Sequence, residues 1–129
     1  MLTVVAAIIE SDGKILACQR KAGGAFGLMW EFPGGKRREG EDWRACLKRE
    51  VQEELGVEIA VGLEYERLFH EYGTHRVWLR FFRCTLLHGE VAPTEGQEVR
   101  WATALEMAGR EFLPADKPVI ERLMRGSGL

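Results

Sequence analysis

The chain has 129 residues, 46% of them hydrophobic and 29% charged, with a formal net charge of −2 at pH 7. This length and composition predict a single globular domain, residues 1–129, that can bury a sizeable core. The slight acidic excess argues against stable, sequence-independent binding of nucleic acid, because proteins with that function carry a surplus of Lys and Arg.

The first segments predict a hairpin followed by a loop. LTVVAAII and KILACQR flank ESDG, and Asp-Gly tolerates positive φ in a tight turn, so residues 2–20 are expected to form a β-hairpin. The apolar start has no basic leader or small-residue cleavage site and turns acidic at Glu10, so it predicts a strand and no membrane segment. Residues 21–29 contain three glycines and no sustained period, which indicates a loop that can close over a ligand.

Residues 31–57 predict a loop, a helix and a second loop. Asp42 suits an N-cap and Gly56 suits a left-handed C-terminal residue, so the helix should run over residues 43–55. At about 100° per residue, this helix has an apolar stripe and a neighbouring acidic stripe. The apolar stripe is Leu47, Val51 and Leu55, and the acidic stripe is Glu50, Glu53 and Glu54.

The remaining segments predict three strands and a terminal helix. Residues 58–72 and 76–87 are rich in β-branched and aromatic residues, and a shorter strand is expected at 98–103. Residues 114–126 begin with a proline and carry apolar residues at helical spacing, which predicts an amphipathic helix. The three cysteines, Cys18, Cys46 and Cys84, are widely spaced and lie outside any C-x-x-C pattern, so we expect no disulfide framework or zinc site and a reducing cytoplasm.

The acidic stripe allows two interpretations. Most Glu-rich helix faces are simply solvated, and Lys48 and Arg49 would partly neutralise this one. However, carboxylates one turn apart repel one another by a few tenths of a kcal/mol. Carboxylate oxygens are also the ligands that Mg²⁺ and Mn²⁺ prefer, so a divalent ion would offset the repulsion.

The spacing of these residues resembles a known family. Gly35, five residues, Glu41, seven residues and then REVQEELGV fit the Nudix box over residues 35–57 at every fixed position. WEFPGGK, an early QR, a late EGQ and PADKPVI are similar, in the same order, to segments of MutT-type nucleoside triphosphate pyrophosphohydrolases. The chain is therefore identified as a member of the MutT-type Nudix hydrolases.

This resemblance implies a fold and a reaction. The fold is an α/β/α sandwich with a central mixed β-sheet and a loop-helix-loop catalytic box. The reaction is in-line attack of water at the β-phosphorus of a (deoxy)nucleoside triphosphate, which releases the monophosphate and pyrophosphate. This chemistry needs charge neutralisation on the phosphates and an activated water, and Mg²⁺, or Mn²⁺ as the alternative ion, supplies both.

The resemblance also implies the residues of the metal site and the catalytic groups. The expected ligands are the Gly34 carbonyl and the carboxylates of Glu50, Glu53, Glu54 and Glu95. Glu98 is an alternative to Glu95. Arg49 is expected to hold the carboxylates in orientation, a task that suits its fixed fork, and Glu41 to support the loop. Glu50, Glu53 and Glu95 all remain open as the acceptor of the water proton, with Glu50 narrowly favoured.

Four further positions match substrate-binding residues of the family: Arg20, Phe32, Lys36 and Asp116. MutT carries Asn where this chain has Asp116. An ionised carboxylate only accepts hydrogen bonds, so it favours a donor-rich base edge, and cytidine nucleotides are as suitable as oxidised purines such as 8-oxo-dGTP. PADKP is also typical of a helix start, and Asp116 as a plain N-cap stays open.

Two other functions stay open at this point. Hydrolysis of dinucleoside polyphosphates or of RNA 5′ ends is the alternative within the family, and an inactive Nudix-fold binding module is the second. Such modules usually lack one or more acids of the box, and none is missing here. The expected partner is a small nucleotide, and the protein is expected to be a monomer or a homodimer.

Overall fold

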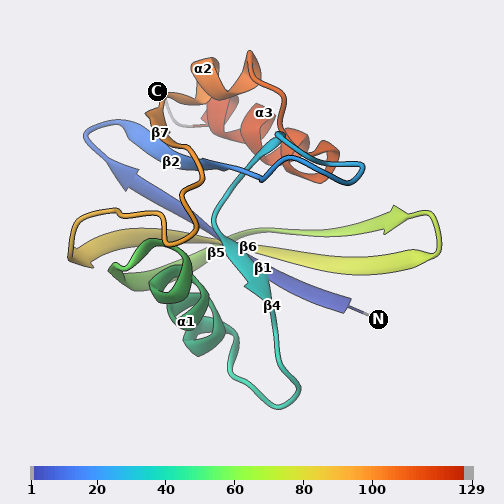
Figure 1. Ribbon diagram of the computed structural model, residues 1–129, viewed down its shortest axis with the longest axis horizontal. Coiled ribbons are helices and arrows are strands. Elements are labelled where there is room, and N and C mark those ends of the chain that lie inside the picture. Colours follow the sequence, from blue (N-terminus) through green and yellow to red (C-terminus); the bar gives the residue numbers. More distant parts are fainter. Residues whose placement is uncertain (1, 127–129) are drawn as a thin grey trace.

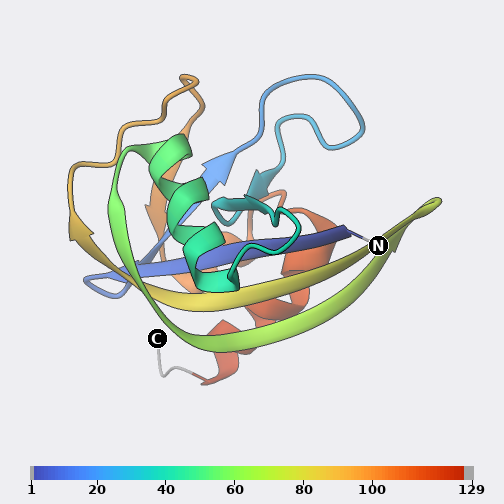
Figure 2. The same ribbon diagram turned by 90° about the horizontal axis from the view of Figure 1, so that it is seen from below.

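The computed structural model describes residues 2–126, which build one seven-stranded mixed sheet (Figures 1 and 2). The strand order is β3-β2-β1-β6-β5, with β4 beside β1 and β7 beside β2. β1 runs parallel to β6, and the other pairs are antiparallel. The strands are β1 Leu2–Ser11, β2 Lys14–Gln19, β3 Trp30–Glu31, β4 Gly34–Lys36, β5 Glu58–Tyr72, β6 His75–His88 and β7 Val99–Ala102.

Helices cover both faces of this sheet. The helix α1 (Trp43–Leu55) packs on one face, and α2 (Ala104–Ala108) and α3 (Lys117–Gly126) pack on the other, with a short 3-10 turn, η1 (Pro114–Asp116), leading into α3 (Figure 1). The predicted α/β/α sandwich with a central mixed sheet is thereby confirmed. Within residues 2–126, no helix is long and apolar enough to cross a membrane.

The central strand β1 supplies side chains to both halves of the core. Successive side chains of a strand point to opposite faces, so an apolar run is buried throughout when both faces are covered. Val5, Ala7 and Ile9 belong to the cluster under α1, which also contains Leu47 and Val51. The alternate residues, Ala6 and Ile8, belong to the cluster under α3, together with Val119, Ile120 and Leu123.

The predicted hairpin exists, but its two strands pair only beside the turn. Asp12 and Gly13 adopt the expected positive φ angles, 52° and 76°. Pairing stops after Glu10↔Ile15 and Ser11↔Lys14. Beyond that point β1 pairs with β6, and β2 pairs with β7. The turn signal is local, whereas the partners of the diverging strands come from distant parts of the chain.

The divergence of β1 and β2 positions the FPGG segment between them. β3 pairs with β2, and β4 pairs with β1, so the chain crosses from one strand to the other at Phe32 and Pro33. The backbone N–H of Ala7 donates to the Pro33 carbonyl at 2.8 Å. The sequence did not predict β3, β4 or α2, because elements of two to five residues carry no measurable hydrophobic period.

Candidate functional site

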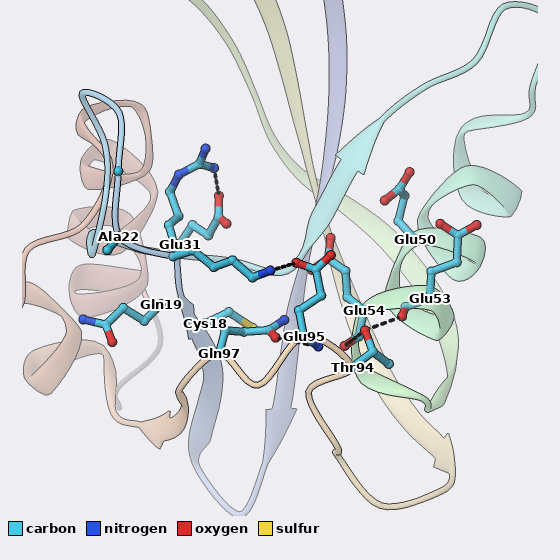
Figure 3. A pocket seen from close by; sticks show the side chains of 13 residues that line it. Cys18, Gln19, Ala22, Glu31, Glu50, Glu53, Glu54, Thr94, Glu95 and Gln97 are labelled. Atoms are coloured by element: carbon cyan, nitrogen blue, oxygen red, sulfur yellow. Dashed lines mark hydrogen bonds and ion pairs between the residues drawn. The ribbon is translucent and has the colours of Figure 1, made fainter.

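A cavity of about 520 Å³ opens where the end of α1, β2 and the loop before β7 meet (Figure 3). Most of its charged lining is acidic, and the basic residues Arg20 and Lys21 lie opposite. Figure 3 shows three of the carboxylates projecting from α1, with the others arriving from β3 and from the loop that carries Thr94. The acidic residues of the lining are Glu31, Glu50, Glu53, Glu54 and Glu95.

The helix α1 presents its acidic stripe to this cavity because both of its ends are fixed. The Asp42 carboxylate accepts a hydrogen bond from the Ala45 N–H at 3.0 Å, and Gly56 adopts the left-handed conformation with φ 69°. The predicted bounds of residues 43–55 are confirmed at both ends. The apolar stripe of the helix, Leu47, Val51 and Leu55, is fully buried against the sheet.

The guanidinium of Arg49 contacts three carboxylates. It donates to both oxygens of Glu41, at 2.8 and 3.0 Å, which is a bidentate pair. Its remaining nitrogen lies 2.9 Å from Glu50 and 3.2 Å from Glu53. The Arg49 hydrogen bond is the main reason that the pKa of Glu41 is lowered to about 2. Glu41 lies outside the cavity lining, so its structural effect on the site is through Arg49.

Glu54 is the carboxylate with the least favourable surroundings for a negative charge. Burial raises its pKa to about 8, with further contributions from Glu31, Glu50 and Glu95. A hydrogen bond with the backbone of Gly34 acts in the opposite direction. The negative charge of ionised Glu54 is therefore disfavoured by its burial and by the neighbouring carboxylates.

Glycine is required next to these carboxylates for steric reasons. A Cβ at Gly35 would lie 2.2 Å from Oε2 of Glu50, and a Cβ at Gly34 would lie 2.0 Å from the Val5 carbonyl oxygen. The contact at Gly34 is with backbone and leaves no room for a side chain, whereas a side chain at Gly35 would force the Glu50 carboxylate to move. The two glycines therefore let β4 approach β1 and the acidic stripe of α1 closely.

The loop before β7 brings Glu95 into the cavity. The Thr94 hydroxyl donates to the carbonyls of Glu53 and Glu54, at 2.8 and 3.1 Å, which fixes this loop to the C-terminal end of α1. The Glu95 carboxylate then lies 2.8 Å from Nζ of Lys21. Glu98, the rival, pairs with Arg100 at 3.4 Å and is not part of the cavity lining.

The four expected carboxylate ligands line one cavity but do not converge on one point, and Gly34 is not part of that lining. Within residues 2–126, no three His, Cys, Asp or Glu side chains lie close enough together to hold an ion as they stand. The reason is visible in the ion pairs: Arg49 draws Glu50 and Glu53 to one side, and Lys21 holds Glu95 on the other.

The expected substrate-binding residues fall into two groups. Arg20 lines the cavity and forms an ion pair with Glu31 at 3.0 Å. Lys36 is exposed on β4 and does not line the cavity. The ring of Phe32 is packed in the core against Phe81 and Phe112, with centroids 5.9 Å apart in both pairs, so it is not at the cavity surface either.

Asp116 is buried and does not cap the terminal helix. It is 4% exposed, it lies inside η1, and within the described residues its Oδ2 has no hydrogen-bond partner. Burial raises its pKa to about 8, and the carboxylate of Glu31 adds to this effect, whereas the Phe32 backbone and Arg20 oppose it. Asp116 therefore lies near the charges of Arg20 and Glu31, but it is not part of the cavity lining.

Two cavity residues, Glu31 and Lys21, were not predicted from the sequence. Burial raises the pKa of Glu31, and Arg20 lowers it. The available signal for Glu31 was an acid between two aromatic residues, which is an unusual position for a charge that has no partner. Lys21 had no comparable signal, because a lysine in a glycine-rich loop is most simply a solvated surface charge.

Comparison with known proteins shows the family of this chain. Residues 4–122 match the family model described as the NUDIX domain, so the chain belongs to the Nudix family. Its relatives include the CTP pyrophosphohydrolase of Escherichia coli (strain K12), 39% identical over 124 residues that cover 96% of this chain and 92% of the relative. The 8-oxo-dGTP diphosphatase of Haemophilus influenzae is 37% identical over 126 residues, with 96% and 92% covered.

A solved structure agrees with the same assignment. The solution structure of the E. coli ORF135 protein superimposes with a TM-score of 0.88 at 37% identity, covering 98% of this chain and 94% of that one. The protein is a Nudix hydrolase of the MutT type. The spacing within residues 35–57 predicted the family, and the similar segments outside it predicted the MutT type.

Proposed function

We propose that this protein hydrolyses (deoxy)nucleoside triphosphates to the monophosphate and pyrophosphate, with Mg²⁺ or Mn²⁺ as the cofactor. The observation that carries the proposal is the single cavity lined by the carboxylates Glu50, Glu53, Glu54 and Glu95 and also by Arg20. The relatives named CTP pyrophosphohydrolase and 8-oxo-dGTP diphosphatase support a role in removing unwanted nucleotides from the precursor pool.

The residues present fit a divalent metal ion. Nudix hydrolases generally need one, and oxygen-rich sites are those that Mg²⁺ and Mn²⁺ prefer. The raised pKa of Glu54, caused by burial among three other carboxylates, is the imbalance that a divalent cation would relieve. We propose that the ligands are the Gly34 carbonyl and the four carboxylates Glu50, Glu53, Glu54 and Glu95.

When bound, the metal supplies charge neutralisation on the phosphates and lowers the pKa of the attacking water. The side chains of the protein do the rest of the proposed work. Arg49 holds Glu50 and Glu53 through one nitrogen, so both carboxylates have restricted positions. Glu50 is held through Oε1 alone, and its second oxygen is available as the proposed acceptor of the water proton.

Asp116 is proposed to read the base. A buried polar atom without a partner is costly, and a nucleotide base would give Oδ2 the hydrogen bond that it lacks. With its pKa raised to about 8, the carboxyl group is largely protonated at neutral pH and can both donate and accept. That pattern suits O6 and N7–H of 8-oxoguanine, whereas the ionised form suits the N4 amine of cytosine.

A nucleotide panel tests the proposal. Hydrolysis products would be separated by anion-exchange chromatography after incubation with Mg²⁺ and each of CTP, dCTP, 5-methyl-dCTP, dGTP and 8-oxo-dGTP, a dinucleoside tetraphosphate and a 5′-triphosphorylated RNA. The proposal predicts the highest kcat/KM with a cytidine or oxidised-purine triphosphate. Preference for the dinucleotide or the RNA would move the protein to a different branch of the family, and turnover of none of them would contradict enzymatic function.

A further inference from the structure

Lys21 and Glu95 join the two loops that border the cavity. Nζ of Lys21 lies 2.8 Å from Oε2 of Glu95, and a dashed line marks this ion pair in Figure 3. Lys21 belongs to the glycine-rich loop after β2, and Glu95 belongs to the loop before β7. Both side chains are 63% exposed, so each can exchange partners without unpacking the core.

The two loops differ in how firmly they are held. The Glu95 loop is fixed to α1 through Thr94 and through the Ala92 N–H, which donates to the Leu55 carbonyl at 2.9 Å. The glycine-rich loop is closed by its own backbone hydrogen bonds, in which the Arg20 N–H donates to the Met29 carbonyl at 2.8 Å and the Leu28 N–H donates to the Lys21 carbonyl at 3.2 Å. Gly23 and Gly24 follow Lys21 with φ angles of 109° and 71°. The backbone of Lys21 is thus held within its own loop, and its exposed side chain is the part that can turn away from Glu95.

Three basic side chains in and beside the cavity, those of Arg20, Lys21 and Arg49, each form ion pairs with carboxylates. Arg20 pairs with Glu31, Arg49 pairs with Glu50 and Glu53, and Lys21 pairs with Glu95. A metal ion that takes Glu95 would compete with Lys21 for the same carboxylate, because two cations at about 4 Å repel each other. A displaced Lys21 would still line the cavity, where a nucleoside triphosphate brings new negative charge.

We infer that Lys21 is an exchangeable counter-ion: it neutralises Glu95 before the metal binds, and afterwards it contacts the phosphates of the nucleotide. This inference rests on the proposed function. Its consequence is a pair of effects with opposite signs. Removing the ammonium group should strengthen metal binding to the free protein and weaken nucleotide binding to the metal-loaded protein, whereas a general loss of structure would weaken both.

The test uses Lys21→Met in the full chain. Binding of Mn²⁺ to the nucleotide-free protein, measured from the electron paramagnetic resonance signal of free Mn²⁺, should become about two- to fivefold tighter, which is the effect of losing one exposed ion pair. At saturating Mg²⁺, the KM for dCTP and for 8-oxo-dGTP should rise about three- to tenfold, with a much smaller change in kcat. Lys21→Arg keeps the charge and should change both quantities less.

Two comparisons separate this role from a general charge effect. Lys14→Met removes the same charge at the first residue of β2, outside the cavity lining, and should leave Mn²⁺ affinity unchanged. In a Glu95→Gln background, Lys21→Met should no longer tighten Mn²⁺ binding, because its effect passes through Glu95. Tightening of equal size in that background would overturn the inference, as would unchanged Mn²⁺ affinity or an unchanged KM in the single variant.

The wild-type protein separates failure of the inference from failure of the proposed function. If the wild type releases pyrophosphate in the presence of Mg²⁺ and Lys21→Met behaves like the wild type, only the role of Lys21 is wrong. If the wild type shows no metal-dependent turnover of any triphosphate, the proposed function itself is wrong.

Discussion

Arg49 and Glu41 form a bidentate ion pair at the edge of the acidic cavity, with Nε and Nη2 of the guanidinium 2.8 and 3.0 Å from the two carboxylate oxygens. The same guanidinium reaches Glu50 and Glu53 through Nη1. Arg49 and Glu41 are 21% and 18% exposed, so the pair is largely shielded from solvent. Glu41 therefore orients Arg49, and Arg49 in turn orients two proposed metal ligands.

This arrangement predicts the result of Arg49→Lys. A lysine keeps the charge but has a single ammonium group, which cannot pair with both oxygens of Glu41 and also reach Glu50 and Glu53. We expect kcat to fall about 10- to 100-fold, the usual effect of losing a residue that orients metal ligands. Arg44→Lys on the same helix is the control and should retain near-normal kcat. A normal kcat for Arg49→Lys would show that its fork is not needed.

The acidic stripe predicts a separation of activity from stability at Glu53. Its side chain is 53% exposed, and its contact with Arg49 is an i,i+4 pair, so Glu53→Gln should leave the melting temperature of the metal-free protein nearly unchanged. Turnover should fall by at least about 100-fold, because a proposed ligand is lost. Mg²⁺ should raise the melting temperature of the wild type, and this rise should shrink in the variant. Normal turnover of Glu53→Gln at saturating Mg²⁺ would contradict the metal assignment.

The burial of Asp116 predicts how stability depends on pH. Its pKa is raised from 3.8 to about 8 in the folded protein, chiefly by burial, and the charged groups around it are Glu31 and Arg20. Between about pH 4 and pH 8 the unfolded chain ionises Asp116 more readily than the folded protein does, so this group lowers stability as pH rises. Asp116→Asn should therefore gain melting temperature relative to the wild type, by more at pH 8 than at pH 5. A difference that is constant with pH would contradict the raised pKa.

The same variant tests how the base is read. In the wild type, raising the pH from 6.5 to 9 should shift the ratio of kcat/KM values from 8-oxo-dGTP towards dCTP, because the carboxyl group loses its donor. Asp116→Asn keeps a donor and an acceptor at every pH, so its ratio should move less and should favour 8-oxo-dGTP by about 1 to 3 kcal/mol per bidentate contact. Identical rankings in both proteins at both pH values would remove Asp116 from the substrate site.

The parts of the fold that were predicted from the sequence are those specified by residues close together in the chain. The helix α1 has a capping aspartate, a terminal glycine and a regular apolar stripe, and its bounds were predicted correctly. The turn at Asp12 and Gly13 was equally clear. The separation of β1 from β2 could not be predicted, because it depends on pairing with β6 and β7, far away in the sequence.

The site also combines features that have a local sequence signal with features that depend on distant parts of the chain. The spacing within residues 35–57 was enough to predict that Glu50, Glu53 and Glu54 share one face of α1, and the cavity contains all three. The burial of Asp116 and the position of Glu31 depend on how η1 and β3 pack on distant elements. The packing of the Phe32 ring in the core is tertiary in the same way.

The central claim is attack of water at the β-phosphorus, with release of a nucleoside monophosphate and pyrophosphate. It is tested most directly by hydrolysing dCTP and 8-oxo-dGTP with Mg²⁺ in ¹⁸O-labelled water and following the products by ³¹P NMR. We predict that the products are the monophosphate and pyrophosphate and that the label appears in pyrophosphate alone. Label in the monophosphate would contradict attack at the β-phosphorus, and release of inorganic phosphate with a nucleoside diphosphate would contradict the proposed reaction altogether.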